Sequence, residues 1–325
     1  MAFALRRPVS IRALLLRSDG TDESIDLAGR GGDRLEKDEL LWVDLESPTP
    51  DELELVRTGL RLDEADAERL ERTTERPKAI VLGGAVEVDI VALGEEIEDD
   101  PVPLQLLIGD GWVVTRHAAT VPFLARHWEM IQDQREVGRL SSVEFLAEVL
   151  DWHLEEIFDA AEGLEQEVDG LDEAALRTES DLLERLVRMR RRIARLRRIL
   201  NPHRVVLAEL RRPDFLRDGE GAAEQIDALT ERFARVQDAI SNVREMLIGS
   251  FDVHMTRVAQ RTNDVMRILT LASVVLLPSV VVAGVMGMNF KVGLFDNASL
   301  FWVVVAVIVA IAPFTLGLAR ARRWI

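Results

Sequence analysis

Hydrophobic residues form two long uncharged runs at the C-terminal end of the chain. Residues 268–290 and residues 297–319 contain no Asp, Glu, Lys or Arg. At about 1.5 Å per residue, each run makes a helix of roughly 35 Å, whereas the hydrocarbon core of a bilayer is about 30 Å thick. We therefore expect two transmembrane helices over these ranges, joined by a short external loop at 291–296, rather than two buried core helices.

The charges beside these runs predict their orientation. Arginines precede the first run and follow the second one in a basic tail at 320–325, whereas the loop is neutral overall. Because positive flanks stay on the cytoplasmic side, both termini are expected in the cytoplasm and the protein in the plasma (inner) membrane. The N-terminal segment is interrupted by Arg6, Arg7 and Pro8, so no signal peptide is expected.

The first part of the chain has the short alternating runs of β-strands. We expect six strands, over residues 11–16, 40–45, 79–82, 86–92, 104–108 and 112–116. Gly83-Gly84 and Asp110-Gly111 suit tight hairpins, and helices are expected after Pro50 and from Asp63 to about Thr74. Strands mixed with helices in this order indicate an α/β or α+β cytoplasmic domain over residues 1–140.

From residue 141 onward the pattern is helical and the charges segregate. Residues 140–176 contain 12 acidic residues and no Lys or Arg, whereas residues 181–200 contain eight arginines and two acids. We expect an antiparallel helical hairpin over 141–213, with charges that compensate one another. RNA binding by the arginines and concentration of cations by the acidic helix are the alternatives.

The next helix is expected to begin near residue 222, within a stalk segment at 214–267, and to continue into the first apolar run over about 100 Å. A row of polar and small residues, which we call the seam, follows one side of this helix. Steps of three and four residues, the period of helices around an axis, connect Asp238, Asn242, Glu245, Gly249, Asp252, Thr256, Ala259, Asn263, Met266, Thr270, Ser273, Leu277, Val280, Gly284 and Gly287. A different face is apolar and expected to pack, and its residues are Val236, Ile240, Val243, Leu247, Phe251, Val258 and Val265.

Two interpretations of this seam remain open. Small and hydroxyl-bearing residues in a membrane helix face other helices or water rather than lipid. In one interpretation, the stalk half of the seam is exposed to solvent and the membrane half packs against other helices. In the other, the seam lines a pore shared by several copies. In a pore, the polar lining residues that can hold hydrated cations are Asp252, Asn263, Thr270 and Ser273. The apolar constrictions that can gate by dewetting are Met266, Leu269 and Leu277.

Composition narrows the chemistry. The 325 residues include 57 acidic and 40 basic side chains, for a net charge of −17, and no cysteine. Thiolate metal sites and cysteine nucleophiles are therefore excluded, and nucleic acid is not expected as a partner. The five histidines show no shared ligand spacing and are expected to be structural. Without a nucleophile elbow, phosphate loop or catalytic carboxylate pair, the chain is expected to be no enzyme and to hold no prosthetic group.

Gly287-Met288-Asn289, at the end of the first apolar run, resembles the signature of the CorA family of divalent metal-ion (Mg²⁺) transporters. The cytoplasmic segments that resemble the same family are Leu41-Trp42-Val43-Asp44-Leu45, Pro48-Thr49-Pro50-Asp51-Glu52 and Glu75-Arg76-Pro77-Lys78. The resemblance implies a homopentameric funnel with a cytoplasmic αβα domain and a pore lined by the first membrane helix. It makes Gly287, Met288 and Asn289 the pore mouth and selectivity filter. Its metal-contacting residues are then Asn289, through the water shell of the ion, Asp252 and Asn263.

The family resemblance also implies a regulatory metal site between neighbouring subunits, for which the candidates are Asp89, Asp227 and Glu231. Lys291 departs from the acidic loop of many magnesium channels, which keeps the ZntB-like branch of the family, a mover of Zn²⁺, as an alternative. We therefore expect transport of Mg²⁺, with Co²⁺ or Ni²⁺ as further ions. The alternatives are a zinc transporter and a membrane-anchored cytoplasmic scaffold or sensor.

Overall fold

The structure of the protein is a computed structural model. It describes residues 10–17, 22–30, 35–36, 39–72, 76–82, 85–134, 141–177, 181–212, 215, 222–288 and 298–321. The chain divides into two compact units, Met1–Phe251 and Asp252–Ile325. Each unit is described by itself, and the finer domain boundaries expected from the sequence remain predictions.

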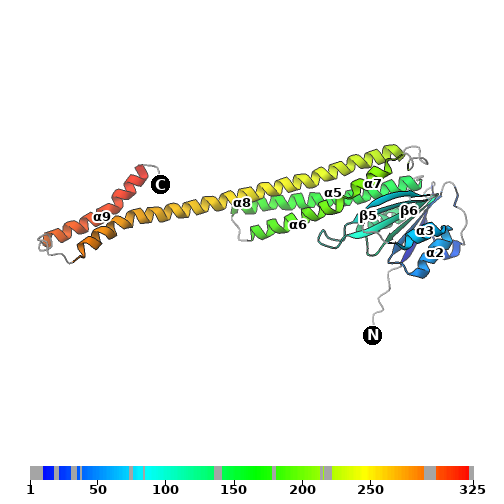
Figure 1. The fold of residues 1–325 in the computed structure, drawn as a ribbon, viewed down its shortest axis with the longest axis horizontal. Helices are drawn as coiled ribbons and strands as arrows, with labels where there is room; N and C mark the ends of the chain where they lie inside the picture. The colour runs from blue at the N-terminus through cyan, green and yellow to red at the C-terminus, as the bar shows by residue number, and fades with distance from the viewer. Residues whose placement is uncertain are drawn as a thin grey trace, which may run out of the picture. The chain divides into compact units, whose positions relative to one another are not determined.

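A seven-stranded sheet lies at one end of the first unit, and long helices extend away from it (Figure 1). Its strands are β1 (Ile11–Arg17), β2 (Glu23–Ser24), β3 (Glu39–Glu46), β4 (Lys78–Leu82), β5 (Ala85–Ala92), β6 (Val102–Gly109) and β7 (Trp112–His117). The order across the sheet is β2-β1-β3-β7-β6-β5-β4, and only β3 and β7 pair in parallel among the described strands. The six expected strands are confirmed. The two-residue β2 was missed because it is too short to show alternation.

Both faces of the sheet are covered, because successive residues of a strand point to opposite sides. On one face Val43 and Leu45 pack with Leu27, Val56 and Leu70, which belong in turn to α1 (Leu27–Arg30), α2 (Pro50–Leu60) and α3 (Glu64–Glu71). On the other face Leu40 and Trp42 join a larger core that includes residues of α4 (Pro122–Gln134), α5 (Ser142–Arg177) and α7 (His203–Leu210). The expected αβα arrangement is therefore confirmed.

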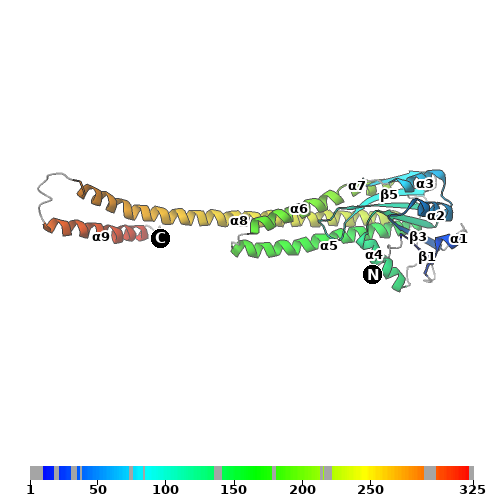
Figure 2. The ribbon, with the colours of Figure 1, turned by 90° about the horizontal axis from the view of Figure 1, so that it is seen from below.

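The helical part of the first unit contains α5, α6 (Leu182–Leu200) and the beginning of α8 (Ala222–Met286), which lie side by side in both views (Figures 1 and 2). The buried residues of α8 recur every three or four positions and include Phe233, Val236, Ile240, Val243 and Leu247. The expected apolar packing face is thus confirmed as far as Leu247. Phe251, Val258 and Val265 are exposed instead, because no described residues of a single copy cover this stretch.

The second unit contains the rest of α8 and α9 (Ala298–Ala321). Among the described residues, the later part of α8 is long and apolar enough to cross a membrane, and none of that window is buried. The apolar stretch of α9 in the described part of the chain is Phe301–Thr315. The predicted loop at 291–296 and residues 322–325 of the predicted tail lie outside the described residues.

Candidate functional site

The membrane part of α8 has one shielded face. Its half-buried residues recur every three or four positions and include Leu271, Val275, Pro278 and Val282. On α9 the half-buried residues with the same spacing are Val304, Ile308, Ile311 and Thr315. Residues at this spacing share one side of a helix. We therefore assign the two sets to the contact between α8 and α9.

The predicted seam lies on the opposite side of α8. Each seam residue follows a half-buried residue by two positions, and two positions turn a side chain by about 200° around the helix axis. The seam residues that stand in this relation are Ser273, Leu277, Val280 and Gly284, and all are exposed. In the first unit the same relation links Asp238, Asn242, Glu245 and Gly249 to the buried Val236, Ile240, Val243 and Leu247. In both units, the seam therefore faces away from what packs against α8.

The polar seam residues are available to water. The hydroxyls of Thr270 and Ser273 donate to the carbonyls of Met266 (2.8 Å) and Leu269 (2.9 Å), four residues earlier in the helix. Each hydroxyl oxygen keeps acceptor capacity, which can serve water or a hydrated ion. Asp252 and Asn263 are exposed. Oxygen atoms are the ligands that Mg²⁺ prefers, so these residue types suit a path for this ion.

Apolar side chains interrupt the polar seam. Met266, Leu269 and Leu277 are 54%, 58% and 67% exposed in one copy. Large apolar side chains exposed to this degree need lipid or another protein surface as a partner. If copies surrounded an axis, these side chains would form the narrow apolar rings that block ions when they dewet.

The signature segment begins where α8 ends. After Met286, the N–H of Gly287 donates to the carbonyl of Ala283 (3.0 Å), and the N–H of Met288 donates to that of Val285 (3.3 Å). A Cβ atom at position 287 would lie 3.4 Å from the carbonyl oxygen of Ala283, so glycine suits this tight turn. The helix C-terminus adds partial negative charge. Asn289, the residue predicted to contact the ion, lies outside the described residues.

The three candidates for a regulatory metal site do not form one within a single copy. Asp89 is buried beneath Lys78, whose Nζ lies 3.2 Å from the Asp89 carboxylate and 2.7 Å from Glu87. Asp227 is paired with Arg211 at 3.0 Å, and Glu231 is exposed. The described residues contain no group of three or more His, Asp or Glu side chains placed to hold a metal. This regulatory site therefore stays a prediction about an assembly.

The charge of Lys78 explains why Asp89 tolerates burial. Burial alone lowers the pKa of Lys78, but its hydrogen bond to Glu87 and the charges of Asp89 and Glu87 outweigh burial and raise the pKa above its usual value. Lys78 is therefore cationic and contacts both carboxylates at the β4–β5 pair. An ion bound at Asp89 would have to displace this ammonium group.

A buried ionic network on β3 was missed by sequence reasoning. The carboxylate of Asp44 accepts from Arg12 (Nε at 2.9 Å, Nη2 at 2.6 Å), from the Thr115 hydroxyl and from His117 Nε2 (3.1 Å). His117 also donates from Nδ1 to the carbonyl of Ala119 (2.7 Å). The one available signal was an acid inside the apolar run Leu41-Trp42-Val43-Asp44-Leu45. The network joins β1, β3 and β7.

The contacts within this network favour the charged forms of Asp44 and His117. Burial lowers the pKa of His117, but the hydrogen bond and charge of Asp44 outweigh it and raise the pKa above its usual value. Burial raises the pKa of Asp44, but His117 and Arg12 outweigh it and hold the pKa below its usual value. The pair is structural, since it lies on the sheet of the first unit and its hydrogen bonds are satisfied within the chain.

Two further histidines are buried and neutral. Burial lowers the pKa of His203 to about 4, and its Nε2 accepts from the N–H of Val91 at 3.1 Å. Burial also lowers the pKa of His153 well below its usual value, and its ring centroid lies 4.7 Å from that of His203. These contacts fit the structural role that was expected for the histidines.

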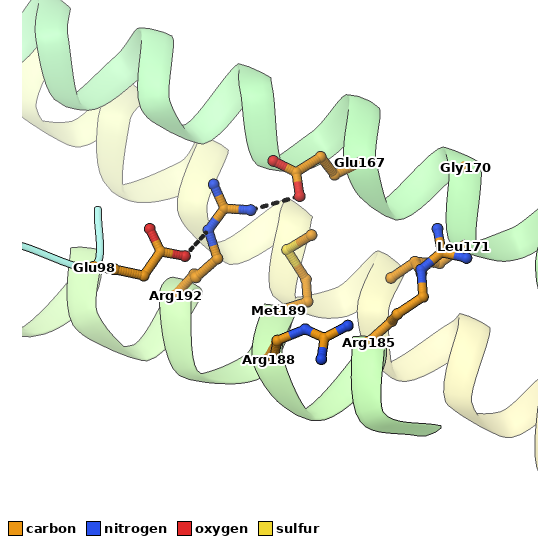
Figure 3. Close-up of a pocket in the computed structure, with 8 residues that line it drawn as sticks. All are labelled: Glu98, Glu167, Gly170, Leu171, Arg185, Arg188, Met189 and Arg192. Carbon is orange, nitrogen blue, oxygen red and sulfur yellow. Dashed lines mark hydrogen bonds and ion pairs between the residues drawn. The ribbon is translucent and has the colours of Figure 1, made fainter. Parts of the chain in front are cut away.

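The charged hairpin is partly compensated, as expected. Arg192 of α6 lies between Glu98 and Glu167 of α5 (Figure 3), with its Nε 2.8 Å from Glu98. Arg185 and Arg188 line the same pocket of about 340 Å³. Arg195 reaches Asp100 at 3.3 Å. Because these arginines already have carboxylate partners, charge compensation is favoured over RNA binding.

The mixed α/β unit, the long helix α8 and the apolar C-terminal helices define a membrane protein. Residues 37–318 match the family described as CorA-like Mg²⁺ transporter protein. The chain is 26% identical over 206 residues to the cobalt/magnesium transport protein CorA of Thermotoga maritima, which covers 61% of this chain and 57% of that protein. It is also 26% identical over 322 residues to the divalent cation transporter CmaX of Pseudomonas aeruginosa, over 92% of this chain and 95% of that one.

The solved structures agree. The complete structure of the CorA magnesium transporter from Methanocaldococcus jannaschii matches with a TM-score of 0.82 and 22% identity, over 98% of this chain and 100% of that one. The chain belongs to the family of CorA-like Mg²⁺ transporter proteins. It is therefore a CorA-type divalent-cation transporter and not an enzyme, and the membrane-anchored scaffold is no longer needed as an explanation of its apolar helices.

Proposed function

We propose that the chain is one subunit of a homopentameric channel that carries Mg²⁺ across the plasma (inner) membrane, with both termini in the cytoplasm. One observation carries this proposal: the seam of α8 is opposite the face assigned to α9. If α9 lies toward lipid, the seam faces inward. The helix that brings Thr270, Ser273 and Gly284 to this inner side then lines the pore.

The proposal needs several copies of the chain. Two membrane helices cannot enclose a pore, and the seam of one copy has no partner among the described residues. Around a common axis, identical seams would give rings of identical side chains. Cyclic assemblies of this kind close through unlike surfaces on neighbouring subunits. The number five rests on the resemblance to the CorA family.

The polar rings suit a hydrated ion. Mg²⁺ loses water reluctantly, so the amide of Asn289, beside Gly287 and Met288, would bind the water shell at the mouth rather than the bare ion. Thr270 and Ser273 would offer hydroxyl oxygens further along. Asn263 and Asp252 would follow in the stalk, where carboxylates attract the cation.

The apolar rings would supply the gate. Met266, Leu269 and Leu277 lie between the outer polar mouth and the stalk carboxylates in the sequence. A ring of such side chains excludes water when it is narrow and passes hydrated ions when it widens. A regulatory ion between subunits, near Asp89, Asp227 and Glu231, would control the width, and at Asp89 it would have to displace Lys78.

The choice of ion follows from the family, whose description names Mg²⁺. The Thermotoga maritima relative is named for cobalt and magnesium, which supports Co²⁺, and by the same chemistry Ni²⁺, as further cargo. A second candidate is Zn²⁺, because Lys291 departs from the acidic loop of many magnesium channels and leaves room for the ZntB-like branch. Five Lys291 side chains in a pentamer would weaken the attraction of any divalent cation at the mouth, and Asp296 would offset part of this effect.

A flux assay on the purified protein in liposomes tests the proposal. We expect Mg²⁺ entry that Asn289→Ala abolishes, whereas the matched control Asn297→Ala, an asparagine outside the signature, keeps it. Size-exclusion chromatography must show the same oligomer for both variants. Mg²⁺ flux that survives Asn289→Ala would refute the assignment of the mouth. Zn²⁺ flux faster than Mg²⁺ flux, with or without a pH gradient, would favour the second candidate.

A further inference from the structure

Several exposed apolar side chains of the first unit lie close together on α6 and α8. The large ones that are exposed among its described residues are Val81, Met130, Leu183, Val187, Val205, Ile248 and Phe251. Val187 of α6 (42% exposed) and Ile248 and Phe251 of α8 (47% and 41%) line a single groove of about 430 Å³. Leu183 lies one turn before Val187 on α6. Such clustering marks a binding surface, because isolated exposed apolar residues are common but grouped ones are not.

Three arginines border this groove, namely Arg190 and Arg197 of α6 and Arg244 of α8. No ion pair or hydrogen bond of their side chains is found within the described part of the chain. Their neighbours differ, since Arg192 and Arg195 are tied to carboxylates. A chain with a net charge of −17 has abundant acids to pair with, yet these three guanidinium groups remain open.

We propose that the groove between α6 and α8 binds an anionic amphiphile, a fatty acid. The apolar lining fits the acyl chain, and the guanidinium groups of Arg190, Arg197 and Arg244 fit a carboxylate, which arginine binds with paired hydrogen bonds. A volume of about 430 Å³ lies within the range of small-molecule sites, which are mostly apolar with a few polar groups that fix orientation. This ligand is separate from the transported ion and from the seam.

A second copy of the chain fits the groove less well. In a cyclic pentamer the groove would meet an unlike surface of the neighbouring subunit, which would have to supply both apolar side chains and acids. The remaining large exposed apolar residues among the described part of the first unit, Val81, Met130 and Val205, lie on three different elements, β4, α4 and α7. The acidic face of α5 offers Asp159, Glu162 and Asp169, and none of the large exposed apolar side chains among the described residues lies on α5. Only a ligand that is both anionic and apolar satisfies both parts of the groove.

The absence of cysteine makes a direct test available. Ala194 lines the groove, and Ala194→Cys introduces the sole thiol of the chain. The full-length variant is labelled there with an environment-sensitive fluorophore, placed in nanodiscs of zwitterionic lipid and titrated with decanoate. We expect saturable binding. Octanoate should bind more weakly, by about fourfold for each CH₂ removed from a fully buried chain, at about 0.8 kcal/mol per CH₂.

Charge is tested with matched variants. The triple change Arg190→Gln, Arg197→Gln, Arg244→Gln should weaken decanoate binding at least tenfold. Arg191→Gln, Arg198→Gln, Arg235→Gln removes the same charge from exposed arginines that do not line the groove and should change little. Decanol should bind far more weakly than decanoate. Equal binding of decanol, equal losses in both triple variants or no saturable signal would overturn the proposal.

The reactivity of the unlabelled thiol separates the fatty acid from a second copy. Without ligand, Cys at position 194 should react quickly with a water-soluble thiol reagent, and decanoate should slow this reaction. Slow reaction before any amphiphile is added would show that protein already fills the groove, which would refute the proposal. None of these readouts depends on ion flux, so failure here leaves the proposed channel untouched, and the reverse also holds.

Discussion

The two units of this chain bury apolar surface in different ways. The first unit covers both faces of its sheet with its own helices, so that Trp42, Phe123 and Phe145 are fully buried in one copy. The second unit leaves Leu276, Leu277 and Trp302 exposed. Soluble surfaces rarely tolerate such patches. The first unit therefore covers its sheet within one copy, whereas the second unit needs partners outside the copy, which are lipid and, in the proposed pentamer, neighbouring subunits.

The helix α8 takes part in both kinds of packing. The packing residues of α8 recur every three or four positions in both units. In the first unit this face of α8 is buried by the chain itself, whereas in the membrane part it is only half-buried. The seam opposite these faces is left open throughout. In the proposed pentamer this open seam, with Thr270 and Ser273 in its membrane part, would line the aqueous path.

Because the core of the first unit is filled within one copy, a large-to-small substitution there should greatly lower the free energy of unfolding. Trp42→Ala should lower the free energy of unfolding by about 3–5 kcal/mol, because it leaves a cavity beside Trp128 and Phe145 and removes the indole N–H that donates to Thr115. Trp302→Ala, at a 70% exposed position of α9, should cost less than about 1 kcal/mol. Urea unfolding followed by circular dichroism measures both variants. Equal losses of unfolding free energy in the two variants would contradict the difference in packing between the two units.

Charge inside the membrane part distinguishes the seam from its surroundings. Leu277→Asp should widen the wet path and raise the ion leak on the order of tenfold, because a charged ring cannot dewet. Leu276→Asp places the carboxylate about 100° around the helix axis from position 277. That variant should instead lower membrane insertion, at a cost of about 2.5–3.5 kcal/mol, without raising the leak. An unchanged leak in Leu277→Asp would place Leu277 off the pore axis.

Buried carboxyl groups make the first unit sensitive to pH. Burial raises the pKa of Glu156 from 4.5 to about 7, although Arg126, at 3.1 Å, opposes this shift. Between these values the folded state keeps a proton that the unfolded state has lost, so stability falls as pH rises through this window. Glu156→Gln should be more stable than the parent at pH 8, by up to about 3 kcal/mol, and similar to it at pH 4.5.

Glu162→Gln is the control for this pH effect, because Glu162 is an exposed acid on the same helix α5. Its unfolding free energy should follow that of the parent protein at both pH values. The same gain at pH 8 in both variants would show that net charge, and not the burial of Glu156, sets the dependence on pH.

The smallest effect is expected where charges compensate at the surface. Arg192→Gln should cost about 1 kcal/mol or less, because Glu98 and Glu167 are about half exposed, at 55% and 50%. The loss should shrink further in high salt. Arg191→Gln, at an exposed neighbour with no ion pair among the described residues, should cost nothing measurable by the same unfolding assay. A loss of several kcal/mol at Arg192 would mean that this ion pair is effectively buried.

Local patterns in the sequence were sufficient for much of this structure. Alternating residues located the six long strands, and steps of three and four residues located the seam, because both periods are properties of single elements. The network around Asp44 was not predictable in this way. Its partners Arg12 and His117 come from strands that are distant in the sequence and adjacent only in the sheet.

The same limit applies to the sites. The groove that carries Arg190, Arg197 and Arg244 exists only where α6 and α8 meet, so neither helix reveals it alone. The regulatory candidates Asp89, Asp227 and Glu231 were chosen by family resemblance, and burial under Lys78 could not be read from the residue type. The ion-contacting role of Asn289 also rests on the resemblance, since Asn289 lies outside the described residues.

Single cysteines along α8 test the central claim most directly, because the chain has none of its own. Cysteines replace Ser273, Leu277 and Gly284 on the seam, and Leu271, Val275 and Val282 on the opposite face, and Mg²⁺ flux into liposomes is measured before and after a water-soluble thiol reagent. We predict that the reagent blocks flux through all three seam variants and spares the other three. Block at the α9 face with free flux at the seam would contradict a pore lined by this side of α8.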